Sequence, residues 1–157
     1  MKLFDWVFGK STPPARTVPA PGINIAIINT ASKKYITQKQ LQSWLPAFQK
    51  YIDNYIYPAW GFKATLHLFA SVKEADPNMW WMVINNTSDD PGALGYHDVQ
   101  PNGHPFGRVF VKDDTEAGAS IPVTITHELA EILGNPFVKN FALIGGKRWV
   151  KELCDAV

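Results

Sequence analysis

The stretch PVTITHELAEILGNP, Pro122–Pro136, decides which fold this sequence predicts. Ser120 and Pro122 are typical of a helix start, and Gly134 followed by Asn135 is typical of a helix end. Between them, apolar residues recur at helical spacing along one side: Ile125, Leu129, Ile132 and Leu133. The stretch therefore predicts an amphipathic helix whose apolar side faces a core.

The polar side of this helix carries the residues HELAE. His127 and Glu131 are four positions apart, so they lie on nearly the same face and can bind one metal ion together. Glu128 lies one position around the helix, where a carboxylate can take a proton without being a ligand. In the H-E-x-x-H motif of zinc hydrolases the two histidines bind the metal and the glutamate is the base. Here Glu131 occupies the position of the second histidine. We expect Glu128 to be the general base.

A carboxylate at position 131 changes the expected metal chemistry. Carboxylates are accepted zinc ligands, so Glu131 can replace a histidine. The replacement adds negative charge and widens the choice of ion towards manganese, iron or calcium. We therefore expect one divalent metal ion, with zinc as the first candidate. The alternative is an ordinary solvated helix face, because H-E-x-x-E should occur by chance in about one chain in a hundred of this length.

A third ligand must come from outside the helix. Zinc hydrolases with the H-E-x-x-H-x-x-G pattern have a histidine three residues after the glycine, but here position 137 is Phe137. The segment KELCDAV, 151–157, supplies Glu152 and Asp155. We expect one of these carboxylates to bind the metal and the other to hold a ligand by a hydrogen bond. The alternative is that no metal binds and that both carboxylates are ordinary solvent-exposed surface groups.

The residues THELAEILGNP followed by ELCD resemble a group of zincin-like proteins found among bacterial and tailed-phage proteins. Members carry H-E-x-x-E, an Asn-Pro or Asp-Pro after the helix, and E-x-x-D near a final element. Through LGYHD and GHPFGRVFV the resemblance extends over roughly residues 94–155. It implies a zincin-like α+β fold and metallopeptidase activity. The matching positions are His127, Glu128, Glu131, Glu152 and Asp155.

The rest of the chain predicts an α+β fold, with a mixed sheet packed on a long helix and on the active-site helix. Thr37 and Gln40 form a capping box at the start of the long helix, Pro46 lies inside it as a kink or a restart, and Pro58 and Gly61 end it. The region 86–107 is rich in turn residues and is expected to be a loop. The segment 145–157 is either a short helix or a last strand. Predicted strands cover 23–29, 64–70, 79–85 and 108–112.

The strand at 108–112 is expected to border the active-site cleft and to pair with an extended substrate. Tyr96 or His97, in the preceding loop, would then polarise the substrate carbonyl or stabilise the oxyanion. His97 has two other possible roles, as the missing nitrogen ligand or as a loop histidine bonded to the backbone or to Asp98. His67, inside a predicted strand, is expected to be structural.

Composition limits the class of protein. The 157 residues fit one domain, 23–157, preceded by a proline-rich arm, 1–22, which either docks on a partner protein or is a disordered tail. A net charge of +1 gives no support for nucleic acid as a partner. No apolar run is long enough to span a membrane, and the N-terminus lacks a secretion signal. With Cys154 as the one cysteine, a disulfide within the chain is excluded. These features favour a cytoplasmic or virion-associated protein.

The expected function is hydrolysis of a peptide or related amide bond by a zinc-dependent enzyme. One alternative is a catalytically inactive binding or structural module of the same fold, such as a phage virion or assembly protein, with metal for stability or none. A second alternative is a calcium-stabilised domain, because the candidate ligands are mostly carboxylates. A peptide or protein is the expected substrate or partner in the first two cases.

Overall fold

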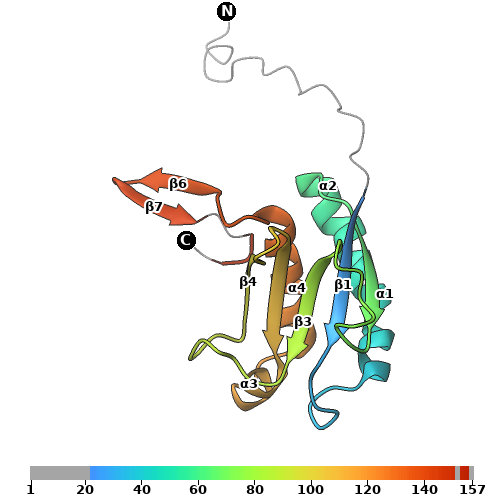
Figure 1. The fold of residues 1–157 in the computed structure, drawn as a ribbon. Coiled ribbons are helices and arrows are strands. Elements are labelled where there is room, and N and C mark those ends of the chain that lie inside the picture. Colours follow the sequence, from blue (N-terminus) through green and yellow to red (C-terminus); the bar gives the residue numbers. More distant parts are fainter. Residues whose placement is uncertain (1–21, 151–152, 156–157) are drawn as a thin grey trace, which may run out of the picture.

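The computed structural model describes residues 22–150 and 153–155, and its centre is one five-stranded sheet (Figure 1). The strand order is β2-β1-β3-β5-β4. The first four strands are parallel, and β4 runs antiparallel to β5 at one end of the sheet. The strands are β1 (Ile23–Asn29), β2 (Ala64–Phe69), β3 (Trp80–Asn85), β4 (Gly95–Val99) and β5 (Pro105–Phe110). The expected α+β class with a mixed sheet is confirmed.

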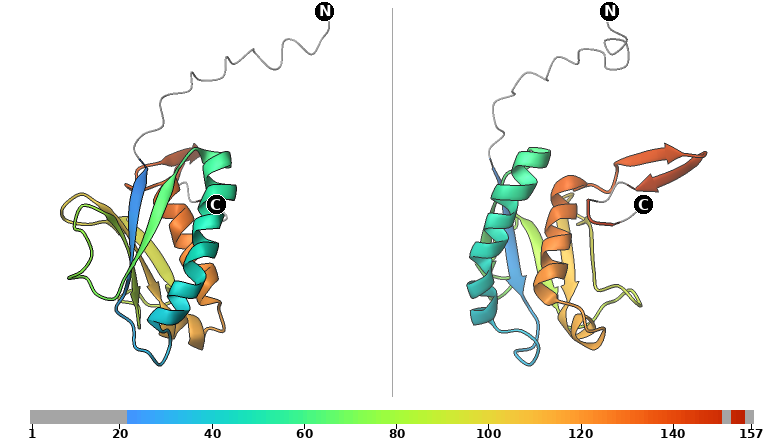
Figure 2. Two further views of the ribbon diagram at one scale, coloured as in Figure 1. Left: turned by 90° about the vertical axis from the view of Figure 1, so that its right-hand side faces the viewer. Right: turned by 180° about the vertical axis from the view of Figure 1, so that it is seen from behind.

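Two long helical segments cover one face of this sheet (Figure 2). The first joins α1 (Gln38–Tyr51), the π-helical turn η2 (Ile52–Ile56) and α2 (Tyr57–Trp60). The second is α4 (Ile121–Gly134), which follows the short α3 (Val111–Glu116). Alternate strand residues meet apolar residues of both helices in the main core, whose fully buried members include Ile25, Ile27, Met82, Ile84, Leu129 and Ile132. Burial of this face fixes α4 across the sheet.

The other face of the sheet has a smaller core. Ala26 and Ile28 are buried there together with Ala75, from the segment that connects β2 to β3, and Trp81 and Val83 pack against them. Parallel strands are normally covered on both faces, and here a loop takes the place of a second helix layer. The site described below lies on the helix-covered side.

The first helical segment begins as the sequence predicts. Thr37 and Gln40 form the capping box, and Pro46 lies within α1. The prediction that Pro58 ends the helix is wrong, because Pro58 lies inside α2. The wider turn η2 precedes it, with the Tyr57 N–H donating to the Ile52 carbonyl, and a proline needs such room because its ring clashes with the carbonyl four residues back. Gly61, with φ of 79°, ends the segment.

Two expectations for residues 86–116 are also corrected. The region expected to be a loop contains β4 and the start of β5, and the strand expected at 108–112 ends at Phe110, where the backbone turns into α3. Residues 108–110 cannot border a cleft as an edge strand, because β5 pairs with β3 on one side and with β4 on the other. The strand at the end of the sheet beside α4 is β4.

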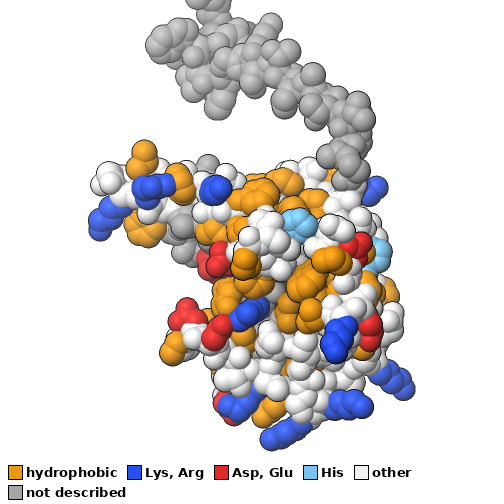
Figure 3. All heavy atoms as spheres, in the orientation of Figure 1, with side chains coloured by type: hydrophobic (Ala, Val, Ile, Leu, Met, Phe, Trp, Pro, Cys, Tyr) orange, Lys and Arg blue, Asp and Glu red, His pale blue; other side chains and the backbone are white. Residues whose placement is uncertain are grey.

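After α4 the chain forms a hairpin of β6 (Phe141–Ile144) and β7 (Lys147–Val150) that extends from the body (Figure 1). Gly145 and Gly146, with φ of 59° and 78°, make the two-residue turn, since both positions require the left-handed region. Of the two alternatives for 145–157, the strand is therefore present over Lys147–Val150. This hairpin exposes both apolar and basic side chains (Figure 3). They are Phe141, Leu143, Ile144, Lys147, Arg148 and Trp149.

None of the helices in the described part of the chain combines the length and the apolar character needed to cross a membrane. The predicted arm, 1–22, lies outside the described residues except for Gly22.

Candidate metal centre

Helix α4 presents its polar residues towards a cavity rather than towards open solvent. Ser120 precedes the helix and Pro122 lies in its first turn, as the sequence predicts. The helix packs against β5 and β4, and this packing buries Glu128 and Glu131 to 3% exposure each. The His127 side chain, at 32%, stays partly open. The alternative of a plain solvated face is therefore not what the structure shows for the two glutamates.

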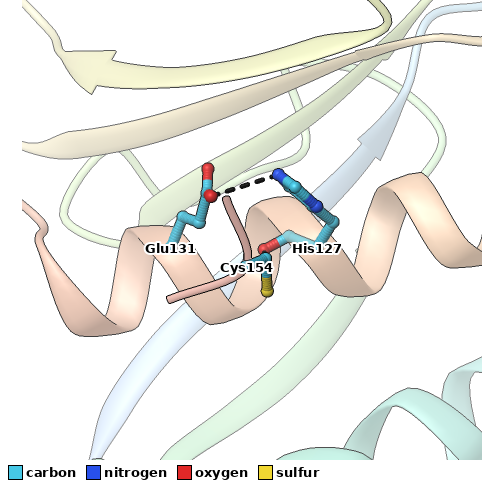
Figure 4. Close-up of side chains that lie close together, drawn as sticks. All are labelled: His127, Glu131 and Cys154. Atoms are coloured by element: carbon cyan, nitrogen blue, oxygen red, sulfur yellow. Dashed lines mark hydrogen bonds and ion pairs between the residues drawn. The ribbon is translucent and has the colours of Figure 1, made fainter. Parts of the chain in front are cut away.

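His127 lies at the centre of the group of side chains. Its Nε2 is 3.1 Å from Oε1 of Glu131 and 3.2 Å from Oδ1 of Asp155. Figure 4 shows the side chains of His127 and Glu131 pointing toward each other from neighbouring turns of α4. Asp155 reaches the same nitrogen from the segment after the hairpin. The structure thus brings together three of the four predicted metal ligands, while Glu152 lies outside the described residues.

The spacing of these atoms fits a metal ion. Ligands at about 2.0–2.1 Å from a tetrahedral ion lie about 3.3 Å from one another. The two distances from His127 Nε2, 3.1 and 3.2 Å, agree with that spacing. A ring nitrogen carries at most one hydrogen, whereas a cation can be shared by the nitrogen and by both carboxylates. The donor set, one imidazole and two carboxylates, suits zinc, manganese or iron.

Charge gives a second test of fit. Glu128 and Glu131 are one helical turn apart, and both carboxylates are almost completely buried. Placing ionised carboxylates in a protein interior costs several kcal/mol each unless cations or hydrogen bonds compensate them. A divalent cation between His127, Glu131 and Asp155 would balance two of the three negative charges. The residues therefore fit a metal centre on charge as well as on distance.

Cys154 is a neighbour that the sequence analysis did not include among the ligands. A sulfur ligand atom of Cys154 lies within 4.8 Å of ligand atoms of His127 and Glu131, and its side chain is drawn beside α4 in Figure 4. The Sγ is 3.8 Å from the backbone carbonyl of His127, to which it can donate. Burial, followed by the charges of nearby carboxylates, raises the pKa of this thiol to about 11. Asp155 is the better third donor on geometry, because its Oδ1 lies 3.2 Å from His127 Nε2, whereas the Cys154 Sγ is directed to the His127 backbone carbonyl.

His97 lies on β4 and faces α4 across the cavity. Its Nδ1 is 3.4 Å from Oε2 of Glu131, and both side chains are 4% exposed. His97 is thus a strand residue beside the candidate metal ligands rather than a loop residue. The side chain of Asp98, the other partner considered, accepts a hydrogen bond from the backbone of Val99. The position of His97 agrees with two of its predicted roles, as a nitrogen ligand of a metal ion and as a group that contacts the substrate carbonyl or oxyanion.

The structure does not bring the hydroxyl of Tyr96 to this group. Successive strand residues point to opposite faces, so Tyr96 faces away from α4 when His97 faces towards it. The Tyr96 hydroxyl donates to Asp89, 3.0 Å away, and the Tyr96 ring packs against Phe106 and Phe110. Burial is the main cause of a raised pKa for this hydroxyl. Tyr96 contributes to the cavity wall, but an oxyanion role for its hydroxyl has no support in this geometry.

The remaining two histidines lie in contacts of their own. His67 Nε2 is 3.0 Å from the side-chain oxygen of Asn24 on the neighbouring strand, which agrees with its predicted structural role. His104 Nδ1 is 3.1 Å from the backbone carbonyl of Pro77. The histidines near the candidate metal are therefore His97 and His127.

The cavity beside the group has a volume of about 570 Å³. Residues 95–97 of β4 form one wall, and α4 forms the other with His127, Glu128 and Glu131. In the described residues the outer edge of β4 pairs with no strand. The cavity is large enough for several residues of an extended peptide, and it places the edge of a sheet beside the candidate metal ligands.

Comparisons with known proteins add no family to this picture. No model of a protein family matches the chain, and no curated protein sequence is significantly similar to it.

Proposed function

We propose that the protein is a metal-dependent hydrolase of peptide or related amide bonds, with a zincin-like fold. One observation carries the proposal. His127 Nε2 lies 3.1 and 3.2 Å from the carboxylates of Glu131 and Asp155, and the buried Glu128 lies beside this group in the same cavity. A base next to a ligand set is the arrangement that metal-assisted hydrolysis requires.

The arrangement of elements supports the zincin-like part of the proposal. A mixed sheet with an antiparallel edge strand lies against a helix that carries His127 and Glu131 four positions apart. A third candidate ligand, Asp155, returns from a later segment. The resemblance of THELAEILGNP and ELCD implies an α+β fold with matching positions at His127, Glu131 and Asp155.

In the proposed reaction, His127, Glu131 and Asp155 hold one divalent cation, most suitably zinc. The cation, when bound, polarises the scissile carbonyl and lowers the pKa of the attacking water. Glu128 accepts the proton of that water and returns it to the leaving amine. Its position in the cavity beside His127 and Glu131 favours this role.

The substrate would lie along β4. Backbone N–H and C=O groups on the outer edge of this strand can pair with an extended peptide, which would be held antiparallel or parallel to residues 95–99. This replaces the sequence-based expectation of a substrate along 108–112. The peptide would then lie along that edge and enter the cavity lined by the candidate base and ligands.

The experiment compares the parent, Glu128→Gln and Glu131→His proteins, each loaded with one equivalent of zinc, on a peptide library. Glu128→Gln keeps the size and hydrogen bonding of the side chain but removes the base. It should retain metal and lose about a hundredfold or more in rate. Glu131→His removes one negative charge from the ligand set and should increase the rate, because the cation becomes a stronger Lewis acid. Glu116→Gln, an exposed position on α3 paired with Lys112, is the matched control and should cleave like the parent.

Two results would contradict the proposal. The first is a parent and a Glu131→His protein that cleave nothing above the Glu128→Gln background. The second is cleavage by Glu128→Gln at the parent rate. The first result with metal still bound would favour the alternative of an inactive binding or structural module.

A further inference from the structure

We propose that His97, Glu128 and Glu131 form a second divalent-cation site that shares Glu131 with the first. The sequence predicted a site for one metal ion. The second site is inferred because the two carboxylate oxygens of Glu131 face two different histidines. The inference deepens the proposed function and rests on it in one respect, the assignment of Glu128 as the base.

Glu131 faces two imidazoles, one with each carboxylate oxygen. Its Oε1 is 3.1 Å from Nε2 of His127, and its Oε2 is 3.4 Å from Nδ1 of His97. The histidines come from different elements, α4 and β4. Both distances are close to the roughly 3.3 Å between two ligands of one tetrahedral ion. The carboxylate is therefore positioned to bridge two cations, one beside each imidazole.

Each side of this bridge also has its own carboxylate. Asp155 lies 3.2 Å from His127 on the first side. On the second side, ligand atoms of His97, Glu128 and Glu131 all lie within 4.8 Å of one another. The two groups have the same composition, one imidazole, one carboxylate of their own and the shared Glu131. This composition suits zinc, manganese or iron.

The backbone of β4 is shaped to admit Glu128 on the second side. Gly95 lies two residues before His97, on the same face of the strand. A Cβ at position 95 would overlap the carboxylate of Glu128 and would lie 2.8 Å from its Cγ. The missing side chain lets this carboxylate lie directly against the strand that carries His97. The three donor side chains are thus held by packing on both elements and are at most 4% exposed.

Charge also favours a second cation. The two candidate sites together contain three carboxylates, those of Glu128, Glu131 and Asp155, and a second divalent ion adds electrostatic attraction for this cluster. Ions that share a bridging carboxylate lie about 3.5–4 Å apart in two-metal sites.

The second ion would alter activity. When Glu128 is a ligand, its lone pairs are no longer available to accept a proton, so the protein with two ions is inactive. With one ion the base is available. We therefore expect hydrolysis to rise with the first equivalent of metal and to fall with the second.

The test measures binding as well as activity. Equilibrium dialysis of the full chain with increasing Zn²⁺ should give two bound ions per chain, the second weaker than the first. With Mn²⁺, electron paramagnetic resonance should show a spin-coupled pair at saturation and isolated ions at low loading. His97→Leu should weaken the second ion by about a hundredfold or more and change the first by less than about tenfold, and the coupled signal should disappear. His97→Asn, which keeps a polar side chain, guards against misfolding of the leucine variant. His104→Leu is the control and should bind like the parent.

Three outcomes would overturn the inference. One is a parent that binds a single ion in excess metal and shows no coupled manganese signal. Another is a His97→Leu protein that loses its first ion, which would make His97 a ligand of the first site. The third is that the His97→Leu and His97→Asn proteins both still bind two ions per chain. In the first outcome, hydrolysis that still depends on Glu128 would leave the proposed function intact. A parent that binds no ion would defeat both proposals.

Discussion

Glu131 determines what this site can do at the residue scale. With Asp155 it surrounds one imidazole nitrogen with two carboxylates, so the ligand set carries two negative charges. Such a set would neutralise a divalent cation and weaken it as a Lewis acid, which lowers the rate expected of the proposed hydrolase. It also makes the choice between zinc and manganese less strict than three neutral ligands would.

The third ligand can be identified by substitution. Asp155→Asn should weaken zinc binding by at least about ten- to hundredfold, because the charged oxygen next to His127 is replaced by a neutral one. Cys154→Ala should leave zinc affinity near that of the parent, since its Sγ lies 3.8 Å from the backbone carbonyl of His127, to which it can donate, while Asp155 lies 3.2 Å from His127 Nε2. Competition with a chromophoric chelator measures both affinities. A loss in Cys154→Ala with no loss in Asp155→Asn would reverse the assignment.

The residues of this site differ in how well the sequence predicted them. His127, Glu128 and Glu131 follow from helical periodicity alone, because their spacing fixes their common face. Asp155 was one of two carboxylates left open, since spacing across a hairpin does not tell which side chain turns inward. The contact between His97 and Glu131 joins residues 34 positions apart in sequence, from 97 to 131. No local pattern reports such a contact, and it depends on the pairing of β4 with β5.

At the scale of elements, the close approach of α4 to β4 forms the site. The sequence predicted β1 and α4 well, since both have strong apolar periodicity. It missed β4, because the residues of this strand facing α4 are Gly95 and His97 instead of apolar side chains, and turn residues surround them. Gly95 and His97 break the apolar pattern by which a strand is recognised in a sequence. The same two residues let β4 border a polar cavity.

Gly95→Ala tests this approach directly. A methyl group at position 95 meets Glu128 on α4 and, at 2.9 Å, the backbone carbonyl of Arg108 on β5, so either the carboxylate moves or β4 shifts against its neighbours. Adding a methyl group to a packed site costs about 1–3 kcal/mol in the free energy of unfolding. We expect that loss in urea unfolding, together with a slower hydrolysis at unchanged zinc content. Gly22→Ala, at a position where a Cβ meets only one ordinary contact, is the control. Parent-like stability and rate in Gly95→Ala would show that Glu128 is not held against the strand.

At the scale of the whole molecule, a buried carboxylate on α3, that of Asp114, makes the stability of the fold depend on pH. Asp114 is fully buried and accepts a hydrogen bond of 2.8 Å from the hydroxyl of Thr124 on α4. Burial, as the largest cause, raises the pKa of Asp114 above its ordinary 3.8. The folded protein then binds more protons than the unfolded chain between the ordinary and the raised pKa. Stability must therefore fall as pH rises through that window.

Asp114→Asn should remove this fall. An asparagine keeps an oxygen that accepts from Thr124 but has no charge. The free energy of unfolding of the variant should therefore increase relative to that of the parent as pH rises above 3.8. The gain should be about 1.4 kcal/mol for each unit by which the pKa is raised. Urea unfolding at a series of pH values measures it, with Asp90→Asn at an exposed position as the control. A difference between Asp114→Asn and the parent that does not change with pH would refute the buried charge as its cause.

The central claim is that His127, Glu131 and Asp155 hold a metal ion together. The most direct measurement is an anomalous difference map at the zinc edge from crystals of the protein reconstituted with zinc. We expect a peak about 2.0–2.2 Å from His127 Nε2, Glu131 Oε1 and Asp155 Oδ1, with Glu128 beside the ion. A map with no peak among these three atoms, and with His127 still bonded directly to the two carboxylates, would contradict it.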